Sequence, residues 1–468
     1  MSAMERDTIA ALSTPAAPGA IGILRLSGPR ALEIVRACFR PLGRRELTEH
    51  PPRTLVYGDL LDSGGVPIDR ALCTYSLGPA SYTGEDTAEL HCHGSPMVLT
   101  LGLEALFAQG ARQAGPGEFT RRAFLNGKLD LTQAEAVGDL LEASSQEGVR
   151  QAAGQLSGAL SQKIEEIYSA LVDVMAHFHA VLDYPDEDID PFTREELART
   201  LDDQEGALRK LVASGARGFQ LAQGLACPIL GRPNAGKSSL LNALAGYDRA
   251  IVTDIPGTTR DTVEVQIQVD GLPVRLIDTA GIREGGDPVE QLGVERSWQT
   301  LASANLILLV WDSSTPFTQE ERRLLLECLN EADTILVENK CDLPAQPLPD
   351  LELTEELAEH LHRVPISART GAGLDRLEAV MARLARDFFP RAQGEAYGQL
   401  LTNERQVQAA ARAREAVERA REALEEGVTP DALLTDVEEA LEALGELTGQ
   451  SVREDITDRI FSRFCVGK

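Results

Sequence analysis

One segment of the sequence has residue types and spacing that predict both a local fold and a ligand. The apolar run 225–230 is followed at once by the motif Gly-x-x-x-x-Gly-Lys-Ser at 231–238, and then by a helix-like pattern at 239–246. In this context the glycines let backbone N–H groups turn inward around a phosphate, the lysine adds a positive charge, and the serine hydroxyl can bind Mg²⁺. The segment therefore predicts a nucleoside triphosphate site without naming the base.

A second group of motifs predicts the base. Asn339-Lys340-Cys341-Asp342 follows the apolar run 334–338. An aspartate at the last of these positions accepts hydrogen bonds from the ring N–H and the exocyclic amine of guanine, whereas adenine presents the opposite pattern. Ser367-Ala368-Arg369, after another short strand, completes the predicted base pocket. We therefore expect guanine.

Two segments between these motifs offer groups for a metal ion and for the γ-phosphate. Thr258-Thr259 comes first, and Asp278-Thr279-Ala280-Gly281 follows, with its aspartate expected to reach Mg²⁺ and its glycine amide the γ-phosphate. All these motifs, in this order and spacing, predict a GTPase domain. The GTP-binding residues predicted from the motifs are Asn234, Ala235, Gly236, Lys237, Ser238, Ser239, Thr258, Thr259, Asp278, Thr279, Ala280, Gly281, Asn339, Lys340, Asp342, Ser367, Ala368 and Arg369.

Length and composition limit the class of protein. A chain of 468 residues is longer than one core usually organises, so two or three domains are expected. An apolar fraction of 43% and a charged fraction of 25% are typical of globular proteins. The sequence shows neither an apolar run as long as a membrane span nor a signal-peptide pattern. We expect a cytoplasmic protein.

Cysteine and histidine usage argues against disulfide and metal frameworks. The seven cysteines are odd in number and include no C-x-x-C pair, which favours reduced thiols. The His-x-His pairs at 177/179 and 360/362 are expected on helices, where residues two apart point about 200° apart. His91 and His93 share one face of a predicted strand, but Cys92 between them points away. We therefore expect no metal site at these pairs.

The first part of the chain reads as mixed α and β structure. Short β-rich runs punctuated by glycine occur at 21–28, 54–60, 70–78 and 87–94, and a helical pattern occupies 96–110. These runs predict a compact α+β domain, to which composition alone assigns no function.

The rest of the chain alternates between helical and α/β patterns. One long helix is predicted from a capping box at Thr132-x-x-Glu135 to just before Tyr184, and another from a capping box at Thr193-x-x-Glu196 toward Leu221. Helical patterning returns after Pro390. Neither helical segment can bury its apolar stripe alone, so the two should pack together around an inserted GTPase module. The predicted domains are 1–125 (N-terminal α+β), 126–223 (helical, first part), 224–386 (GTPase) and 387–468 (helical, second part, ending in the tail FCVGK).

Two finer patterns carry structural predictions. The runs 263–269 and 273–278 flank Asp270-Gly271, which predicts a hairpin and one antiparallel strand in an otherwise parallel sheet. The helix pattern at 411–427 carries four arginines that would suit a nucleic-acid stripe, but interleaved glutamates favour ion pairs on a solvated face. The arginines are Arg412, Arg414, Arg419 and Arg421, and the glutamates are Glu415, Glu418 and Glu422.

The sequence lacks the glutamine that orients the attacking water in small signalling GTPases, so other residues must supply its function. The position after Asp278-Thr279-Ala280-Gly281, where small signalling GTPases carry a water-orienting glutamine, holds Ile282. The side-chain carbonyl of Asn234 could help bind a monovalent cation that neutralises phosphate charge, and Glu290 could fix the water. Glu284 and Asp287 are rivals for the second role, and Arg260 and Arg283 are candidate arginine fingers.

The order of parts resembles the MnmE (TrmE) family of tRNA-modification GTPases. The resemblance covers essentially the whole chain through GRPNAGKSSLLNAL, IVTDIPGTTRD, DTAGIRE, NKCD, SAR, GEFTRRAFLNGKLDLTQAEAV and the terminal FCVGK. Local departures are Cys341 in the guanine motif and Val466 in the tail. The resemblance implies an N-terminal α+β folate-binding-like domain that mediates homodimerisation, a discontinuous helical domain, and an inserted Ras-like P-loop GTPase domain.

The resemblance also implies a reaction and its site residues. A potassium-activated GTPase, with an FAD-dependent partner of the MnmG (GidA) family, would add a carboxymethylaminomethyl or aminomethyl group to C5 of the wobble uridine of certain tRNAs, using a folate one-carbon unit. The nucleotide site would also include Thr253, Asp254, Ile255, Pro256 and Gly257. Potassium would be held by Asn234, Thr253, Ile255 and Thr258, and Mg²⁺ by Ser238 and Thr259. The folate 5-formyltetrahydrofolate would be held by Arg25, Glu89, Lys128 and Lys468. The catalytic residues would be Glu290, Asn234, Lys237 and Cys465, and the role of Cys465 is left open.

Two other classes of function remain open from the sequence. A GTP-driven RNA-binding or ribosome-assembly switch would need a basic domain, and the net charge of −28 argues against one. A folate-dependent aminomethyltransferase with a regulatory GTPase domain is the other. Capture of an FAD-bearing partner would favour the tRNA modifier, and capture of ribosomal particles would favour the switch.

Overall fold

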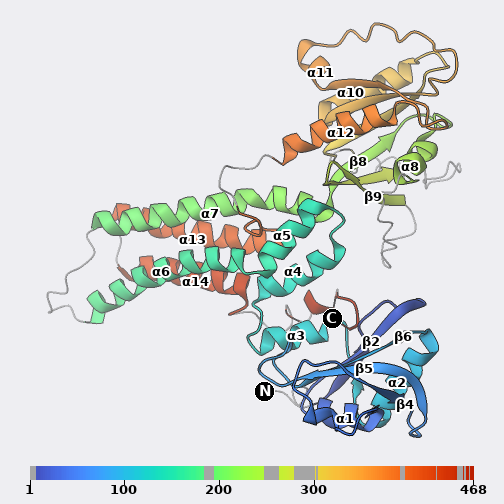
Figure 1. Cartoon of the computed structure of the whole chain (residues 1–468). Helices are drawn as coiled ribbons and strands as arrows, with labels where there is room; N and C mark the ends of the chain where they lie inside the picture. The colour runs from blue at the N-terminus through green and yellow to red at the C-terminus, as the bar shows by residue number, and fades with distance from the viewer. Residues whose placement is uncertain are drawn as a thin grey trace, which may run out of the picture. The chain divides into compact units, whose positions relative to one another are not determined.

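The computed structural model describes residues 7–183, 194–246, 263–278, 301, 304–389, 396–427, 430–450, 457, 460–462 and 464–467. The chain divides into two compact units. The first consists of Met1–Gly138 with Glu442–Lys468, and the second of Asp139–Leu441. Figure 1 shows the elements of each unit along the chain.

The first unit is built on a seven-stranded sheet of order β3-β4-β5-β6-β2-β1-β7. Its neighbouring strands run antiparallel except for β1 and β7, which are parallel. Buried residues of α1 and α2 pack with the sheet to form the core. The elements are β1 (Ile9–Leu12), β2 (Gly19–Ser27), α1 (Ala31–Cys38), β3 (Phe39–Pro41), a 3-10 helix (Leu47–Glu49), β4 (Val56–Leu61), β5 (Pro67–Ser76), β6 (Thr87–Gly94), α2 (Pro96–Ala108), β7 (Arg112–Gln113) and α3 (Glu118–Leu125).

This unit confirms the predicted mix of strands and one helix at 96–110, and it adds elements that the sequence patterns did not reveal. β2, β4, β5 and β6 correspond to the predicted β-rich runs, whereas β1 and α1 were missed. β6 alternates as expected, since Leu90 and Cys92 are buried and the histidines on either side of Cys92 face the other way.

The helical part contains α4 (Leu131–Glu142), α5 (Gln146–Leu156), α6 (Ala159–Asp183), α7 (Arg194–Gln223), α13 (Glu404–Glu426) and α14 (Pro430–Thr448). The long helices α7 and α13 lie side by side (Figure 1). Glycines allow this close approach: a Cβ on Gly215 would lie 2.4 Å from Val407 of α13, and one on Gly218 would lie 2.0 Å from the carbonyl oxygen of Leu401, just before that helix. The expected packing of the two helical segments on each other is therefore observed.

The prediction of one continuous helix up to Tyr184 was wrong. The chain forms three helices there, because the Ser145 side chain accepts a hydrogen bond from the Gly148 N–H and begins α5, and Gly158, at φ +91°, separates α5 from α6. The predicted capping box at Thr132 was also wrong. Asp130 fills that role, since its carboxylate accepts from the Gln133 N–H at 2.9 Å while the Gln133 side chain accepts from the Asp130 N–H at 3.0 Å. Thr193 of the second predicted box lies outside the described residues.

The GTPase part is a six-stranded sheet of order β13-β12-β11-β8-β10-β9. Only β9 runs antiparallel to its neighbour, and a turn at Asp270-Gly271 joins it to β10, as predicted. α8 and α12 contribute to the core on one face of the sheet, and α10 to the core on the other. The elements are β8 (Leu225–Leu230), α8 (Lys237–Gly246), β9 (Val263–Val269), β10 (Leu272–Asp278), β11 (Leu306–Asp312), α10 (Gln319–Glu331), β12 (Asp333–Asn339), α11 (Glu355–Glu359), β13 (Leu361–Pro365) and α12 (Leu374–Phe388).

Three further features concern a histidine pair, clusters of possible metal ligands and the arginines of α13. His360 and His362 do not share a helix, because His360 ends α11 and His362 lies in β13. The described residues contain no cluster of three or more His, Cys, Asp or Glu side chains suited to a metal ion. Two of the four arginines of α13 form ion pairs with other helices and not with the glutamates of their own helix: Arg419 pairs with Asp436 and Glu439, and Arg421 with Asp202.

Among the described helices, none combines the length and the apolar character that crossing a membrane would require.

Candidate functional site

The loop between β8 and α8 has the form predicted for a phosphate-binding loop. Gly231 and Gly236 have positive φ angles, and both are too crowded for a side chain. A Cβ on Gly231 would lie 2.2 Å from the Val310 carbonyl oxygen, and one on Gly236 would lie 2.2 Å from the amide nitrogen of Asn339. The two glycines therefore let the loop lie directly against β11 and the guanine motif.

The lysine of this loop is held inside the loop itself. Lys237 is buried, and its Nζ donates hydrogen bonds to the carbonyl oxygens of Gly231 at 2.7 Å and Arg232 at 3.0 Å. Its ammonium group thus lies within the ring of backbone that would surround a phosphate. Lys237 is the first residue of α8, so the helix N-terminus adds its own preference for an anion at this point.

Two of the predicted metal ligands meet at the end of β10. The Ser238 Oγ donates a hydrogen bond to Asp278 Oδ2 over 3.3 Å. Asp278 is buried at the carboxyl end of its strand, and Ser238 lies in the first turn of α8. A hydroxyl and a carboxylate are oxygen ligands of the kind that Mg²⁺ prefers, so these residues fit a magnesium site beside the phosphate loop.

Asn339 joins the phosphate loop to the predicted base pocket. Its side-chain Nδ2 donates to the Ala235 carbonyl oxygen at 2.8 Å, and its Oδ1 accepts from the Ala368 N–H at 3.0 Å. The residue is buried at the end of β12. One amide side chain therefore links two loops that come from distant parts of the sequence.

The residues that follow Asn339 present a carboxylate at the base pocket. Asp342 Oδ2 accepts a hydrogen bond from Arg369 at 2.6 Å. The pKa of Asp342 lies below its ordinary value, chiefly because the Ser367 side chain donates a hydrogen bond to it and also because Arg369 is close. The carboxylate that would read guanine is thus ionised and able to accept.

Sequence reasoning missed Asp312, which supports this loop. Lys340, at φ +65°, directs its Nζ to Asp312 Oδ2 at 2.5 Å. Burial raises the pKa of Asp312, but the hydrogen bonds from Lys340 and Ser314 and the charge of Lys340 together outweigh burial, so that the pKa lies below the usual value. The available signal was the position of Asp312 at the carboxyl end of β11, beside Asn339 at the end of β12.

The remaining predicted nucleotide residues fall into two groups. Asn234 and Ser239 are exposed in and after the phosphate loop, and Asn234 adopts φ +63°. The other predicted nucleotide residues lie outside the described residues: Thr253, Asp254, Ile255, Pro256, Gly257, Thr258, Thr259, Thr279, Ala280 and Gly281. The same holds for Ile282, for the water-positioning candidates Glu284, Asp287 and Glu290, and for the arginine-finger candidates Arg260 and Arg283.

In the first unit, the predicted folate residues Arg25 and Glu89 face each other across β2 and β6. Arg25 Nε donates to Glu89 Oε1 at 2.8 Å, and His91 Nε2 lies 3.2 Å from Glu89 Oε2. The Arg25 guanidinium also lies 6.0 Å from the ring of Tyr82 and 5.8 Å from the ring of Phe119. Burial raises the pKa of Glu89, but the charges of Arg25 and His91 and their hydrogen bonds together outweigh burial, so the pKa lies below its ordinary value. This half-buried cluster combines a cation, a carboxylate and an aromatic face.

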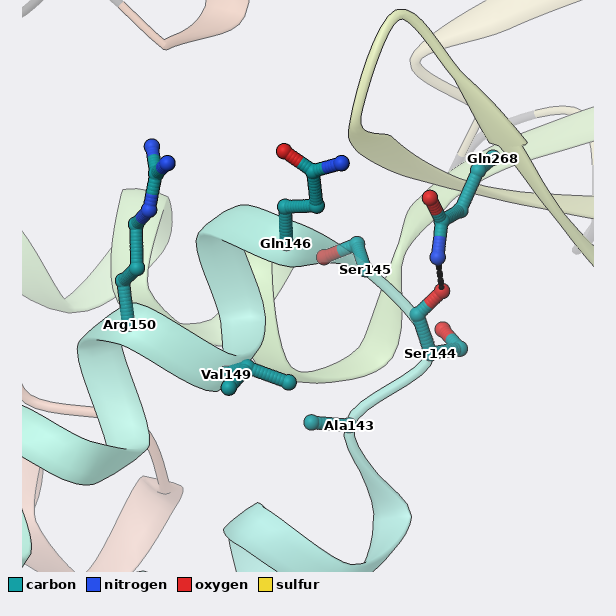
Figure 2. A pocket seen from close by; sticks show the side chains of 7 residues that line it. All are labelled: Ala143, Ser144, Ser145, Gln146, Val149, Arg150 and Gln268. Atoms are coloured by element: carbon teal, nitrogen blue, oxygen red, sulfur yellow. Dashed lines mark hydrogen bonds between the residues drawn. The ribbon is translucent and has the colours of Figure 1, made fainter.

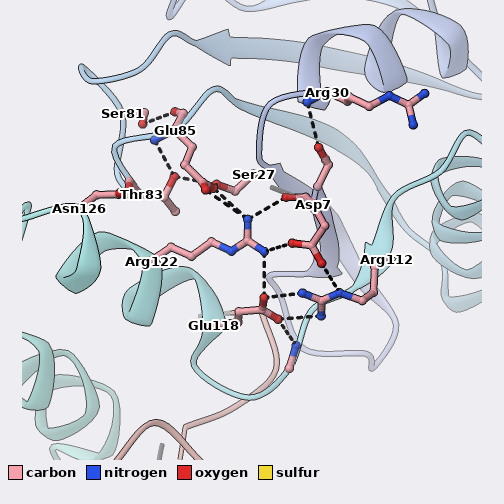
Figure 3. Close-up of polar contacts among 12 residues, drawn as sticks. Asp7, Ser27, Arg30, Ser81, Thr83, Glu85, Arg112, Glu118, Arg122 and Asn126 are labelled. Atoms are coloured by element: carbon pink, nitrogen blue, oxygen red, sulfur yellow. Dashed lines mark hydrogen bonds and ion pairs between the residues drawn. The ribbon is translucent and has the colours of Figure 1, made fainter. Parts of the chain in front are cut away.

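A network of ion pairs fixes the helix that carries Phe119, and sequence reasoning missed it (Figure 3). Arg122 of α3 is buried and binds Asp7 at 2.6 Å, Glu118 at 3.0 Å and Glu85 at 3.1 Å. Arg112 adds bonds of 2.7 Å to both Asp7 and Glu118. Glu85 lies in the loop that carries Tyr82, and α3 carries Phe119. The network therefore fixes the two segments whose aromatic rings lie near Arg25.

The tail of the chain packs against the N-terminal part of the same unit. Val466 forms a β-bridge with Pro116, and the Cys465 carbonyl oxygen accepts from the Gly117 N–H at 3.2 Å. The thiol-bearing residue Cys465 is itself exposed. Lys128 is exposed, and Lys468, the fourth predicted folate residue, lies outside the described residues.

Comparison with known proteins assigns the chain to a family. The sequence model described as "MnmE helical domain" matches residues 131–465, and the one described as "GTP-binding protein TrmE N-terminus" matches residues 8–128. "tRNA modification GTPase MnmE" of Symbiobacterium thermophilum is 43% identical over 465 residues, covering 99% of this chain and 100% of the relative. The protein of that name from Geobacillus kaustophilus is 42% identical over 468 residues, with 99% and 100% covered.

Among solved structures, the G domain of the T. maritima FeoB iron transporter is 27% identical, covers 36% of this chain and 99% of its own, and has a TM-score of 0.26. The two family models match residues 131–465 and 8–128, and the two relatives are covered over their whole length. This chain belongs to the MnmE (TrmE) family of tRNA-modification GTPases.

Proposed function

We propose that this chain is a potassium-activated GTPase that works with an FAD-dependent partner of the MnmG (GidA) family. Together they would add a carboxymethylaminomethyl or aminomethyl group to C5 of the wobble uridine of certain tRNAs, using a folate one-carbon unit. The observation that supports the GTPase part most strongly is Asn339, whose two hydrogen bonds join the phosphate loop at Ala235 to the base loop at Ala368. Such a link suits a site that binds phosphates and guanine at once.

The family resemblance implies the residues that would hold the two metal ions, and their oxygen donors suit both ions. Ser238, with Thr259, would hold Mg²⁺, and its hydroxyl already lies against the Asp278 carboxylate. Potassium would take the side-chain carbonyl of Asn234 together with Thr253, Ile255 and Thr258. The cation would neutralise charge that develops between the β- and γ-phosphates, as an arginine finger does in other GTPases. Glu290 would orient the attacking water.

A folate would bind at the Arg25–Glu89 pair, with Lys128 and Lys468 completing the set. A cation suits the carboxylates of a folate tail, a carboxylate suits the amine and ring N–H of a pterin, and Tyr82 and Phe119 offer ring faces beside them. Calorimetric titration with 5-formyltetrahydrofolate would test this site. The double variant Arg25→Ala, Glu89→Ala should lose binding, whereas Arg40→Ala, Asp59→Ala, which removes another ion pair of the same sheet, should bind like the wild type. Equal binding by all three proteins would place the folate elsewhere.

The assembly that we propose follows from the family. The chain would act in the cytoplasm as a homodimer through its N-terminal unit, and it would form a hetero-oligomer with the FAD-dependent partner and bind tRNA. FAD would enter only through the partner. Cys465, exposed beside Gly117, is available for chemistry at the tail, and we assign it no step.

The experiment that tests the proposed function is mass spectrometry of wobble uridines in tRNA from a strain that lacks this gene. The C5-substituted nucleosides should disappear, and a plasmid copy of the wild-type gene should restore them. A plasmid copy carrying Lys237→Ala should not, because the phosphate loop has lost its cation. Unchanged wobble nucleosides in the deletion strain would refute the proposal, and ribosomal particles accumulating instead would favour an assembly switch.

A further inference from the structure

The hairpin of β9 and β10 lies between the nucleotide site and the helical part of the same unit. β10 ends at Asp278, whose carboxylate accepts the hydrogen bond from Ser238 of the phosphate loop. β9 pairs with β10 along its whole length, from Leu272 opposite Val269 to Asp278 opposite Val263. Because this ladder is continuous, a displacement at Asp278 moves both strands together.

One face of β9 carries two glutamines that reach the helical part. Gln266 and Gln268 occupy alternate positions and therefore point the same way. Gln266 Nε2 donates to the Gln223 carbonyl oxygen at 3.1 Å, and Gln268 Nε2 donates to the Ser144 carbonyl oxygen at 2.5 Å (Figure 2). The turn adds a third contact, because the Glu147 N–H lies 3.5 Å from the Gly271 carbonyl oxygen.

The two acceptors lie at points where a small shift matters. Gln223 is the last residue of α7, which leads through Gly224 into β8 and the phosphate loop. Ser144 lies in the linker between α4 and α5, next to Ser145, whose side chain begins α5. The hairpin thus contacts the end of one long helix and the start of another through the amide side chains of Gln266 and Gln268 and through the backbone of its turn at Gly271.

The space beside these contacts permits more than one arrangement. An open groove of about 330 Å³ lies along the linker, lined among others by Ser144, Gln146, Val149 and Gln268 (Figure 2). The Ser144 hydroxyl is buried and has no hydrogen-bond partner within the described part of the chain. The groove and the unpartnered hydroxyl lie next to the Gln268 bond, so the linker has space and a further polar group with which it could shift against the hairpin.

We propose that Gln266 and Gln268 are positioning residues that couple the occupancy of the nucleotide site to the α4–α5 linker and the end of α7. The inference rests on the proposed function only in that the phosphate loop must bind GTP. The glutamines touch neither the phosphate loop nor Asp278, so they act through the hairpin and not on the nucleotide. A static brace would have the same contacts but would not respond to the nucleotide.

Amide hydrogen exchange of the full chain distinguishes coupling from bracing. In the wild type, exchange at residues 143–148 should differ at least about threefold between the GDP form and the form with a non-hydrolysable GTP analogue. In Gln266→Ala, Gln268→Ala that difference should vanish, while the nucleotide still protects residues 231–240. Gln408→Ala, which removes an exposed amide that contacts Glu404 on α13, is the matched control and should keep the wild-type difference.

Each result has a distinct meaning. A linker difference that persists in the double glutamine variant would overturn the inference, and so would a wild-type linker that ignores the nucleotide while residues 231–240 are protected. Protection at neither place in the wild type would instead refute the GTP site and, with it, the coupling. As a second readout, the double variant should hydrolyse GTP within about twofold of the wild type and unfold at the same temperature, yet support less wobble-uridine modification in cells.

Discussion

The hydroxyl of Ser238 donates a hydrogen bond to the carboxylate of Asp278 over 3.3 Å, although 40 positions separate the two residues in the sequence. The contact brings the first turn of α8 to the end of β10, where a metal ion that bridges phosphates would be needed. Asp278 is also the end of the hairpin whose glutamines reach the helical part.

Replacing Ser238 by alanine should weaken magnesium-dependent hydrolysis if the Ser238 hydroxyl is a direct ligand of the metal, as we propose. We expect Ser238→Ala to raise the Mg²⁺ concentration for half-maximal GTP hydrolysis at least about tenfold. Removing a residue that only supports a metal ligand already lowers metal affinity about tenfold or more, and removing a ligand itself should do at least as much. Phosphate release measured across a Mg²⁺ titration gives this value. Ser157→Ala, which removes an exposed hydroxyl at the end of α5, is the control. An unchanged Mg²⁺ requirement would remove Ser238 from the metal site.

Potassium should accelerate hydrolysis more than sodium does at equal ionic strength. A cage of carbonyl oxygens matched to the larger ion holds sodium poorly, and a cation that replaces an arginine finger should give at least about a tenfold effect. Asn234→Ala should reduce this ratio because the cage loses its side-chain oxygen. Initial rates in potassium chloride and sodium chloride measure it. Equal rates for the wild type would mean that a protein side chain neutralises the charge, and Arg260 and Arg283 would be the next residues to replace.

The ion-pair network around Arg122 should make the N-terminal unit sensitive to acid. Burial raises the pKa of Glu118, but the hydrogen bonds from Arg112, Arg122 and the Gly115 N–H and the charge of Arg122 together outweigh burial, so the pKa lies below the ordinary value of 4.5. A carboxyl with a lowered pKa in the folded state contributes stability above its unfolded pKa and loses it as the pH falls through the folded pKa.

Glu118→Gln should therefore unfold at a lower temperature than the wild type near neutral pH, and the gap in Tm should narrow below about pH 4.5. Calorimetric scans between neutral pH and pH 3 measure the gap. Glu33→Gln, which removes an exposed carboxylate paired with Arg30, should show almost no gap at any pH. A gap for Glu118→Gln that stays constant with pH would show that the network does not stabilise the charged form.

Gly231→Ala should destabilise the GTPase part because neither the backbone nor the space accepts a side chain. The residue has φ +138°, and its Cβ would lie 2.2 Å from the Val310 carbonyl oxygen. Strain and overpacking together should cost about 3 kcal/mol. Urea unfolding followed by the fluorescence of Trp311, which is buried next to Val310, measures the loss. Gly246→Ala, where nothing lies within 4 Å of the added carbon, should cost far less, and equal losses at both sites would contradict the steric argument.

The sequence predicted those features whose causes lie within short segments. The Asp270-Gly271 turn, the strand before the phosphate loop and the guanine motif each depend on a few neighbouring residues, and each was found where expected. The three-helix arrangement of 131–183 was not predicted, because apolar spacing continues through the breaks and only the Ser145 cap and Gly158 interrupt it.

Contacts between distant residues were the least predictable. Nothing local marks Arg122 as the centre of a network that includes Asp7 and Glu85, since the partners lie 115 and 37 positions away. Asp130 replaced Thr132 as the helix cap because its carboxylate is placed to accept from the Gln133 N–H. Lys340 turns toward Asp312, which no motif had marked.

The most direct test of the account is whether the guanine site drives the tRNA chemistry. Asp342→Asn should change the preferred base from guanine to xanthine, because the amide presents a hydrogen-bond donor where the carboxylate presented an acceptor. In a reaction of purified chain, FAD-dependent partner, folate and tRNA, mass spectrometry should find modified wobble uridine with GTP for the wild type. The Asn variant should form it with xanthosine triphosphate and not with GTP. Two results would contradict the account. One is that the variant with GTP modifies wobble uridine at the wild-type level, and the other is that either protein modifies it without any nucleotide.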